Sequence, residues 1–133
     1  MAQVSLKYGR STIDLAFDPE KFEELGSEGS SDALSDAELG DRLDRPIDSA
    51  RIEEIVSPGE TVLIVVPDAT RQTGCGQIIN LLVRRLIANG TAPHEISIIF
   101  ATGIHRKVTD SEKSEILTPF ILQRIKTMDH NAR

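Results

Sequence analysis

The sequence contains little cysteine and no long apolar run. One cysteine, Cys75, occurs in 133 residues, which excludes an intrachain disulfide framework and favours a reducing compartment. The longest apolar run, Val62 to Val66, is far shorter than the roughly 20 residues of a membrane-spanning helix. The first residues, Met1 to Val4, lack the basic and apolar regions of a secretory signal. We therefore expect a cytoplasmic protein that has no membrane partner.

Positive charge is also scarce. The chain has 15 lysine and arginine residues against 21 aspartate and glutamate residues, and its formal net charge is −6. Nucleic-acid binding relies on a basic surface, so we expect no nucleic-acid partner. Acids crowd residues 14–60, and several cations follow them: Arg71, Arg84, Arg85, Arg106 and Lys107. The later half is therefore able to attract a small anion although the whole chain is acidic.

Nucleotide and metal motifs are absent from the sequence. There is neither a Gly-Lys-Ser/Thr phosphate loop nor a Gly-x-Gly-x-x-Gly segment, so a nucleoside triphosphate site is not expected. His94, His105 and His130 lack the spacing of metal ligands, so we expect this chain alone to bind no metal. Cys75 could be a nucleophile near a helix N-terminus. No histidine can be paired with it, and a small residue in a tight turn is the simpler interpretation.

The pattern of apolar residues divides the chain into three parts. Residues 1–17 alternate apolar and polar side chains around a glycine, which predicts a β-hairpin. Residues 18–59 combine a polar loop at 26–31 with short helices. Residues 60–133 alternate apolar runs with helical patterns, which predicts a β-α-β-α-β core with parallel strands. We expect one α/β domain, with a Rossmann-like parallel sheet and flanking helices after the hairpin.

Capping motifs and apolar stripes locate the helices. Ser35 and Thr109 each begin a capping box, which predicts a helix starting at each of them. Ser49 is the expected cap of a further short helix. The longest helix is predicted over residues 77–89. Its expected apolar stripe consists of Ile78, Ile79, Leu82, Leu86 and Ile87.

Three apolar runs predict the strands of the sheet. The run at 61–66 is continuous, which is typical of a parallel strand buried on both faces. Further runs follow at 95–100 and 125–128. Another helix would normally cover a sheet that ends on this third strand. We therefore expect the chain to be a fragment of a longer protein.

Polar side chains follow the first of these strands. Asp68, Thr70 and Arg71 come directly after it, where parallel strands of α/β proteins present side chains to ligands. An arginine side chain can hold a carboxylate or phosphate by two parallel hydrogen bonds. The alternative is that Asp68 caps the following turn and Arg71 pairs with it or with a surface acid. The pattern alone leaves both interpretations open.

A second polar group follows the next strand and should lie at the same edge of the sheet. It contains Thr102, Gly103, His105 and Arg106. His105 is the best candidate for acid–base chemistry, because imidazole titrates near neutrality. The alternative is an exposed loop histidine without a function. The two polar groups together predict a site at this edge.

Two motifs, each placed after a strand, carry a family resemblance. They are Asp68-x-Thr70-Arg71 and Ala101-Thr102-Gly103-x-His105-Arg106. In their order and separation, and in the segments Tyr8-Gly9-Arg10 and Arg45-Pro46-Ile47, the chain resembles the N-terminal part of the lactate racemase family. The resemblance spans nearly the whole chain, which corresponds to about the first third of a typical ~400-residue member.

The resemblance implies that the chain is the N-terminal part of a longer two-domain enzyme. This enzyme is a racemase or epimerase of a lactate-like 2-hydroxy acid that transfers hydride to a nickel pincer nucleotide. This cofactor is a pyridinium-3,5-bisthiocarboxylic acid mononucleotide that holds nickel. By the same resemblance, His105 is one of two histidines that shuttle the hydroxyl proton, and Arg71 binds the substrate carboxylate or the anionic cofactor. The other motif residues are expected to complete the binding pocket: Asp68, Thr70, Thr102, Gly103 and Arg106.

The chain departs from the family pattern at two positions. The family often has proline after the arginine of each motif, where this chain has Gln72 and Lys107, and this leaves the substrate open. The resemblance places a second catalytic histidine, a cofactor-attaching lysine and a nickel-ligating histidine beyond Arg133. We therefore expect the isolated chain to be inactive and to bind no cofactor, with the C-terminal domain of the same protein as its partner. The alternative is a non-catalytic α/β module that binds a small anion or docks another protein.

Overall fold

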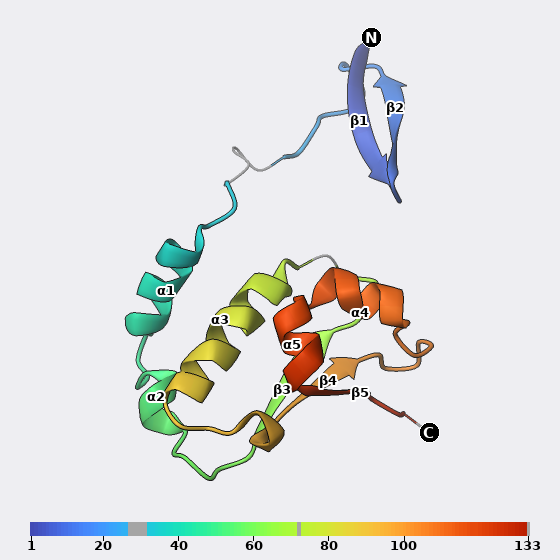
Figure 1. The fold of residues 1–133 in the computed structure, drawn as a ribbon. Helices are drawn as coiled ribbons and strands as arrows, with labels where there is room; N and C mark the ends of the chain where they lie inside the picture. The colour runs from blue at the N-terminus through green and yellow to red at the C-terminus, as the bar shows by residue number, and fades with distance from the viewer. Residues whose placement is uncertain (27–31, 72, 133) are drawn as a thin grey trace. The chain divides into compact units, whose positions relative to one another are not determined.

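The structure is a computed structural model that describes residues 1–26, 32–71 and 73–132. The chain forms two compact units, Met1–Ala33 and Leu34–Arg133 (Figure 1). The polar loop predicted at 26–31 lies outside the described residues except for its first position. The assignment of all 133 residues to a single domain stays a prediction.

The first unit contains the predicted β-hairpin. β1 (Ala2–Tyr8) pairs antiparallel with β2 (Ser11–Phe17), with the two strands in register along their whole length. The two-residue turn contains Gly9 at φ +60°, a left-handed conformation that glycine adopts without steric penalty. Several apolar side chains of the hairpin stay about half exposed: Leu6, Ile13 and Leu15.

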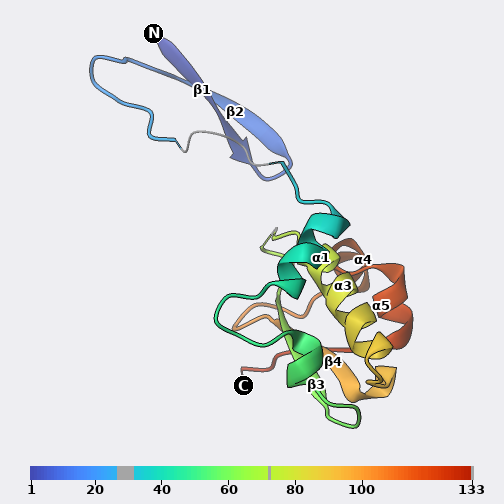
Figure 2. The same ribbon diagram turned by 90° about the vertical axis from the view of Figure 1, so that its left-hand side faces the viewer.

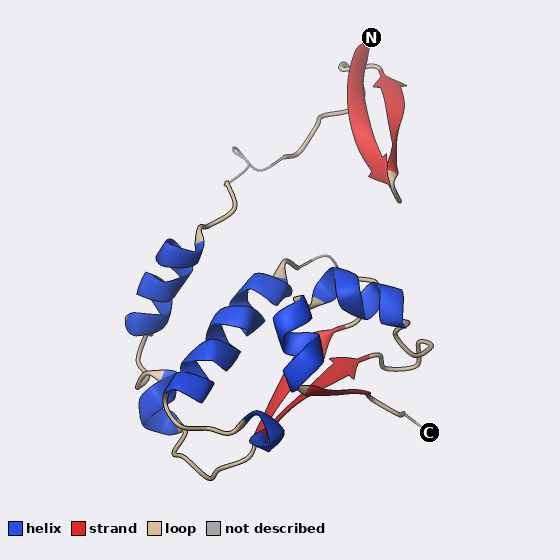
Figure 3. Cartoon of the chain, viewed as in Figure 1, coloured by secondary structure: helices blue, strands red, loops and turns tan. Residues whose placement is uncertain are grey.

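The second unit is a three-stranded parallel sheet with helices packed on it. Its elements are α1 (Asp36–Asp44), α2 (Ile52–Ile55), β3 (Val62–Pro67), α3 (Cys75–Ala88), a short 3₁₀ helix (Pro93–Glu95), β4 (Ile96–Ala101), α4 (Asp110–Ile116), α5 (Pro119–Arg124) and β5 (Lys126–Asp129). The strands lie in the order β3-β4-β5, and both pairs are parallel. Helices α3, α4 and α5 lie on the same side of the strands (Figures 2 and 3). The predicted fold class is confirmed.

The core lies between the sheet and these helices. The strands contribute Val66, Ile96, Ile98 and Phe100. The helices and the segments next to them contribute Ile79, Val83, Leu86, Leu117, Ile121 and Ile125. Alternate residues of a strand point to one face, and residues spaced by three or four share one side of a helix. The sequence pattern therefore brings these two sets of side chains together.

The first strand of the sheet is buried on one face, and the prediction of burial on both faces is wrong for the described chain. Val66 is 2% exposed, whereas Leu63 is 57% and Val65 is 66% exposed. Successive side chains of a strand point to opposite faces. Because the described helices pack on the face that contains Val66, the neighbouring apolar positions of β3 stay open.

Helix α3 begins two residues earlier than predicted and buries a slightly different stripe. Its N-terminal boundary is Gly74 at φ +65°. Val83 is fully buried and was not predicted, whereas Ile78 is 40% exposed. The buried positions Ile79, Val83 and Leu86 are spaced by four and three residues. Ile78 is displaced from this stripe by about 100°, the rotation between neighbouring helical residues.

The capping box predicted for α1 is confirmed, and the predicted cap of α2 is wrong. The Ser35 amide donates to the Glu38 carboxylate at 2.8 Å, and the Ser35 hydroxyl accepts from the Glu38 amide at 3.3 Å. Helix α2 starts after Arg51, whose amide donates to the Glu54 carboxylate at 2.9 Å. Ser49 instead donates its hydroxyl to the carbonyl of the next residue at 3.0 Å. The carboxylate three residues into the helix thus satisfies the free amide at its start.

Arg85 of α3 ties the short helices to the sheet unit. Its guanidinium pairs with Glu53 of α2 and with Asp44 at the end of α1. These two carboxylates, with Glu53 the stronger, raise the pKa of Arg85. None of the described helices is long and apolar enough to cross a membrane.

Helix α4 and strand β5 agree closely with the predictions. Thr109 caps α4 with a complete capping box, as expected. Pro119 occupies the first turn of α5, where its missing amide hydrogen costs nothing. Strand β5 begins at Lys126, one residue after the predicted start. The polar loops that follow β3 and β4 are therefore placed by well-defined elements on both sides.

Candidate active site

The loops that follow β3 and β4 start side by side. Pro67 pairs with Ala101 at the carboxyl end of the two parallel strands. The next residue of each loop, Asp68 and Thr102, is buried, with 5% and 2% exposure respectively. Register between the strands therefore brings the two polar groups of the sequence to one edge, as predicted.

Asp68 and His105 form a direct contact across these loops. The distance between Asp68 Oδ2 and His105 Nδ1 is 2.6 Å. The Asp68 side chain is 7% exposed, whereas the His105 side chain is 54% exposed. A carboxylate can only accept, so Nδ1 carries the hydrogen in this contact. Nε2 of the neutral ring is then the nitrogen that is able to take a proton.

The other oxygen of Asp68 is held by Thr70. The Thr70 hydroxyl donates to Asp68 Oδ1 at 2.6 Å and the Thr70 amide donates to it at 3.1 Å. The pKa of Asp68 lies below its ordinary value, first because of the Thr70 hydroxyl and then because of His105. Asp68 is therefore ionised at neutral pH. It caps its own turn, as one interpretation predicted, and also contacts the histidine.

The turn that presents His105 is built by Thr102 and Gly103. The His105 amide donates to the Thr102 carbonyl at 2.9 Å, and Gly103 has φ +57°, which a residue with a side chain rarely adopts. The Thr102 hydroxyl donates to the His130 carbonyl at 2.8 Å. Both residues thus shape the loop, and their binding of a ligand stays a prediction.

Arg106 is engaged by a carboxylate of α4. Its Nη1 and Nη2 donate to the two oxygens of Glu112 at 2.8 and 2.6 Å. Glu112 also accepts from the Thr109 amide at 2.8 Å. Arg106 first, and then this amide, lower the pKa of Glu112 to about 2. Arg106 therefore binds an acid of its own chain, and binding of a ligand by Arg106 stays a prediction.

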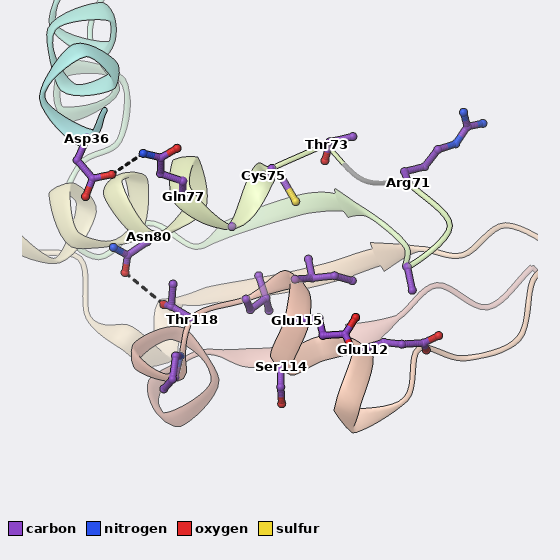
Figure 4. A pocket seen from close by; sticks show the side chains of 16 residues that line it. Asp36, Arg71, Thr73, Cys75, Gln77, Asn80, Glu112, Ser114, Glu115 and Thr118 are labelled. Atoms are coloured by element: carbon purple, nitrogen blue, oxygen red, sulfur yellow. Dashed lines mark hydrogen bonds between the residues drawn. The ribbon is translucent and has the colours of Figure 1, made fainter. Parts of the chain in front are cut away.

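Arg71 is an exposed cation of the site. Its amide donates to the Asp68 carbonyl at 3.1 Å, and its side chain borders a hollow of about 730 Å³ between the start of α3 and α4. Figure 4 shows its guanidinium pointing away from Glu112 and Glu115. Arg71 makes no ion pair with any other described residue. It is therefore free to meet an anion from outside.

His105 lies between two smaller hollows. One, of about 320 Å³, is lined by Asp68, Thr70 and Arg106 beside the imidazole. The other, of about 480 Å³, lies toward Lys107 and His130. Across the part of the chain that the structure describes, no three histidine, cysteine or acidic side chains gather as a metal-binding group.

Sequence reasoning missed the contributions of Glu112 and Asp129 to this site. Glu112 was predicted only as part of a helix cap. Asp129 ends β5 and accepts from the Val108 amide at 2.9 Å. The available signal was its position after the third strand, since carboxyl ends of parallel strands share an edge. No pattern in the sequence indicates which loop amide it meets.

The fold and these contacts define the class of the protein: an α/β domain that presents an aspartate–histidine pair at the carboxyl edge of a parallel sheet. Residues 8–133 match the lactate racemase N-terminal domain family, and the chain belongs to this family.

Two characterised relatives are longer than this chain. The chain is 33% identical over 117 residues to the lactate racemase of Lactiplantibacillus plantarum, which covers 84% of this chain and 27% of that protein. Its fold is similar to the structure of the lactate racemase apoprotein from Thermoanaerobacterium thermosaccharolyticum, with a TM-score of 0.74 and 21% identity. That match covers 99% of this chain and 31% of the other. The chain thus spans less than a third of the length of either relative.

Proposed function

We propose that this chain forms one side of the active site of a 2-hydroxy acid racemase or epimerase, in which His105 exchanges the proton of the substrate hydroxyl. The contact between Asp68 and His105 is the observation that carries the proposal. It fixes the tautomer, so that Nε2 can accept a proton. The ionised carboxylate then stabilises the imidazolium that forms.

Arg71 is the group suited to the substrate carboxylate. It is exposed and unpaired among the described residues, and it follows the same strand as Asp68. A guanidinium can hold a carboxylate with two parallel hydrogen bonds. Arg71 borders a different hollow from His105, and Ala69 and Glu112 line both hollows. A substrate held by Arg71 would therefore meet the loop that carries His105 across this shared border.

The described residues fit part of the nickel pincer nucleotide that the family resemblance implies. Arg71 and the start of α3, where the first amides of the helix lack partners within it, suit an anionic group. The described residues hold no three-ligand group for a metal, so the nickel would need ligands from another domain. When bound, the cofactor would supply the acceptor for hydride from the substrate carbon. His105 would take the hydroxyl proton in the same step and return it afterwards.

Replacing His105 tests the proposal in the full-length protein loaded with its cofactor. His105→Gln should lower the rate of interconversion of L- and D-lactate by about 10²- to 10⁴-fold, the usual contribution of a general acid–base group. Chiral chromatography of the products measures it. Lys107→Gln, in the same loop, is the control that should keep the rate. A variant without the imidazole that racemises at the original rate would exclude His105 from this role.

The exposed Arg71 also favours a second candidate, a module that binds small anions without catalysis. In this case the isolated chain should bind lactate or phosphate with heat that calorimetry detects, and Arg71→Ala should abolish binding. Arg84→Ala, which removes an exposed cation stacked on Phe120, is the matched control. Anion binding by the chain together with a full-length protein that racemises nothing would favour this candidate over the enzyme.

A further inference from the structure

The loop that carries His105 is held at both ends by residues outside the two motifs. We call residues 102–108 the His105 loop. At its start, the buried Thr102 donates its hydroxyl to the carbonyl of His130 at 2.8 Å. The amide of His130 in turn donates to the Phe100 carbonyl at 2.9 Å. The chain that leaves β5 therefore runs alongside the start of the loop.

At its other end, the loop is held by Asp129, the last residue of β5. Asp129 Oδ1 accepts from the amide of Val108 at 2.9 Å. Lys113 of α4 places its Nζ 3.6 Å from Asp129 Oδ2, and the side chains of this pair are 17% and 11% exposed. A carboxylate removed from water in this way needs partners for its charge. Asp129 has one on each oxygen.

We propose that Asp129 is a positioning residue for His105. By accepting from the Val108 amide while paired with Lys113, it fixes the end of the His105 loop and so keeps the imidazole against Asp68. His105 lies three residues from Thr102 and three from Val108, midway between the two anchored ends. Release of one end lets the middle of the loop move while the sheet beneath it stays in place.

The pair of Arg106 and Glu112 supports the same assignment. Glu112 and Lys113 are neighbours on α4, and each holds the His105 loop or the residue that anchors it. Helix α4, the end of β5 and the loop thus form one connected set of charged contacts. Asp129 is the member that joins β5 to the loop. An effect of Asp129 on catalysis rests on the proposed function. Its effect on the position of the His105 ring does not.

Nuclear magnetic resonance on the full chain tests this assignment. Asp129→Ala should accelerate hydrogen exchange of the Val108 amide by about ten- to a hundredfold, as expected for a lost hydrogen bond to a charged group. The imidazole ¹⁵N signals of His105 should lose the pattern of a ring held in the Nδ1–H form. Asp129→Asn should retain that pattern, because its amide oxygen can still accept from the Val108 amide.

A control separates positioning from general stability. Ile121→Val shortens a fully buried side chain of α5 and should lower stability without changing the imidazole signals. Unchanged His105 signals in Asp129→Ala would overturn the proposal. A second measurement needs no variant: the scalar coupling through the hydrogen bond between the Val108 amide nitrogen and the Asp129 carboxyl carbon. Its presence supports the proposal, and its absence overturns it.

Activity of the full-length protein separates this inference from the proposed function. If the protein racemises lactate, Asp129→Ala should lower kcat about tenfold or more and leave KM nearly unchanged. The reason is that the variant displaces His105, which moves a proton and does not bind the substrate. An equal loss in Ile121→Val would contradict positioning. If the original protein racemises nothing, the proposed function fails while the magnetic resonance result for His105 still stands.

Discussion

Asp68 shows how a single hydroxyl keeps a buried acid charged. The largest cause of its lowered pKa is the hydroxyl of Thr70, and the contact with His105 comes second. A carboxyl whose pKa is lowered by folding adds stability that is present above its unfolded pKa of about 3.9. This stability is lost as the pH falls through the lower pKa of the folded state.

Thr70→Val should therefore destabilise the chain by about 1.5–3 kcal/mol at pH 7, the range for a hydrogen bond to a charged group. The loss should shrink near pH 3, where the Asp68 carboxyl is partly protonated both in the folded variant and in the unfolded chain. Urea denaturation at the two pH values measures the difference. Thr73→Val, in the same loop and exposed, is the control and should have little effect at either pH. An equal loss at both pH values would mean that the hydroxyl does not act through the charge of Asp68.

Arg106 and Glu112 allow a direct measurement of a pair at the same scale. Arg106 is the first cause of the lowered pKa of Glu112, which is about 2. In Arg106→Gln this pKa should rise toward the ordinary glutamate value of about 4.3, while the Thr109 amide keeps part of the shift. A carbon-13 titration of the Glu112 carboxyl measures it. As the pH falls, the stability that the ionised Glu112 contributes should therefore be lost at a higher pH in the variant than in the original chain. If the pKa of Glu112 stays at about 2 in the variant, a group other than Arg106 lowers it.

At the scale of elements, Gly76 sets how closely α3 approaches α4. A Cβ placed on this glycine would lie 2.2 Å from the backbone carbonyl oxygen of Ile116. In Gly76→Ala this overlap should outweigh the gain in helix propensity of about 1 kcal/mol, with a net loss of about 1–3 kcal/mol. Gly40→Ala in α1, which meets no atom within 4 Å, should instead stabilise slightly. Chemical denaturation of both variants checks the prediction, and a stabilised Gly76→Ala would mean that the helices are farther apart.

At the scale of the whole molecule, the sequence predicts those features that local residue patterns determine. Capping at Ser35 and Thr109 and the apolar runs of the strands were sufficient to place the helices and the parallel sheet. The closeness of the two motif loops also followed from parallel pairing. The partners of Arg106 and Asp129 were not predictable, because they depend on distances across the sheet edge. Nor does the apolar character of Leu63 indicate whether another layer covers it.

The one-sided covering of the sheet leads to a prediction about the whole layer arrangement. Val65 and Val66 are neighbours in β3 with the same side chain, yet they are 66% and 2% exposed. Valine to threonine keeps the shape and adds a hydroxyl, so its cost depends on whether water or core surrounds it. Val66→Thr should therefore destabilise the chain by about 1–3 kcal/mol, whereas Val65→Thr should change its stability by less than about 0.5 kcal/mol. Urea denaturation of both variants measures the contrast. Equal losses would show that a further layer of the chain covers the face of Val65.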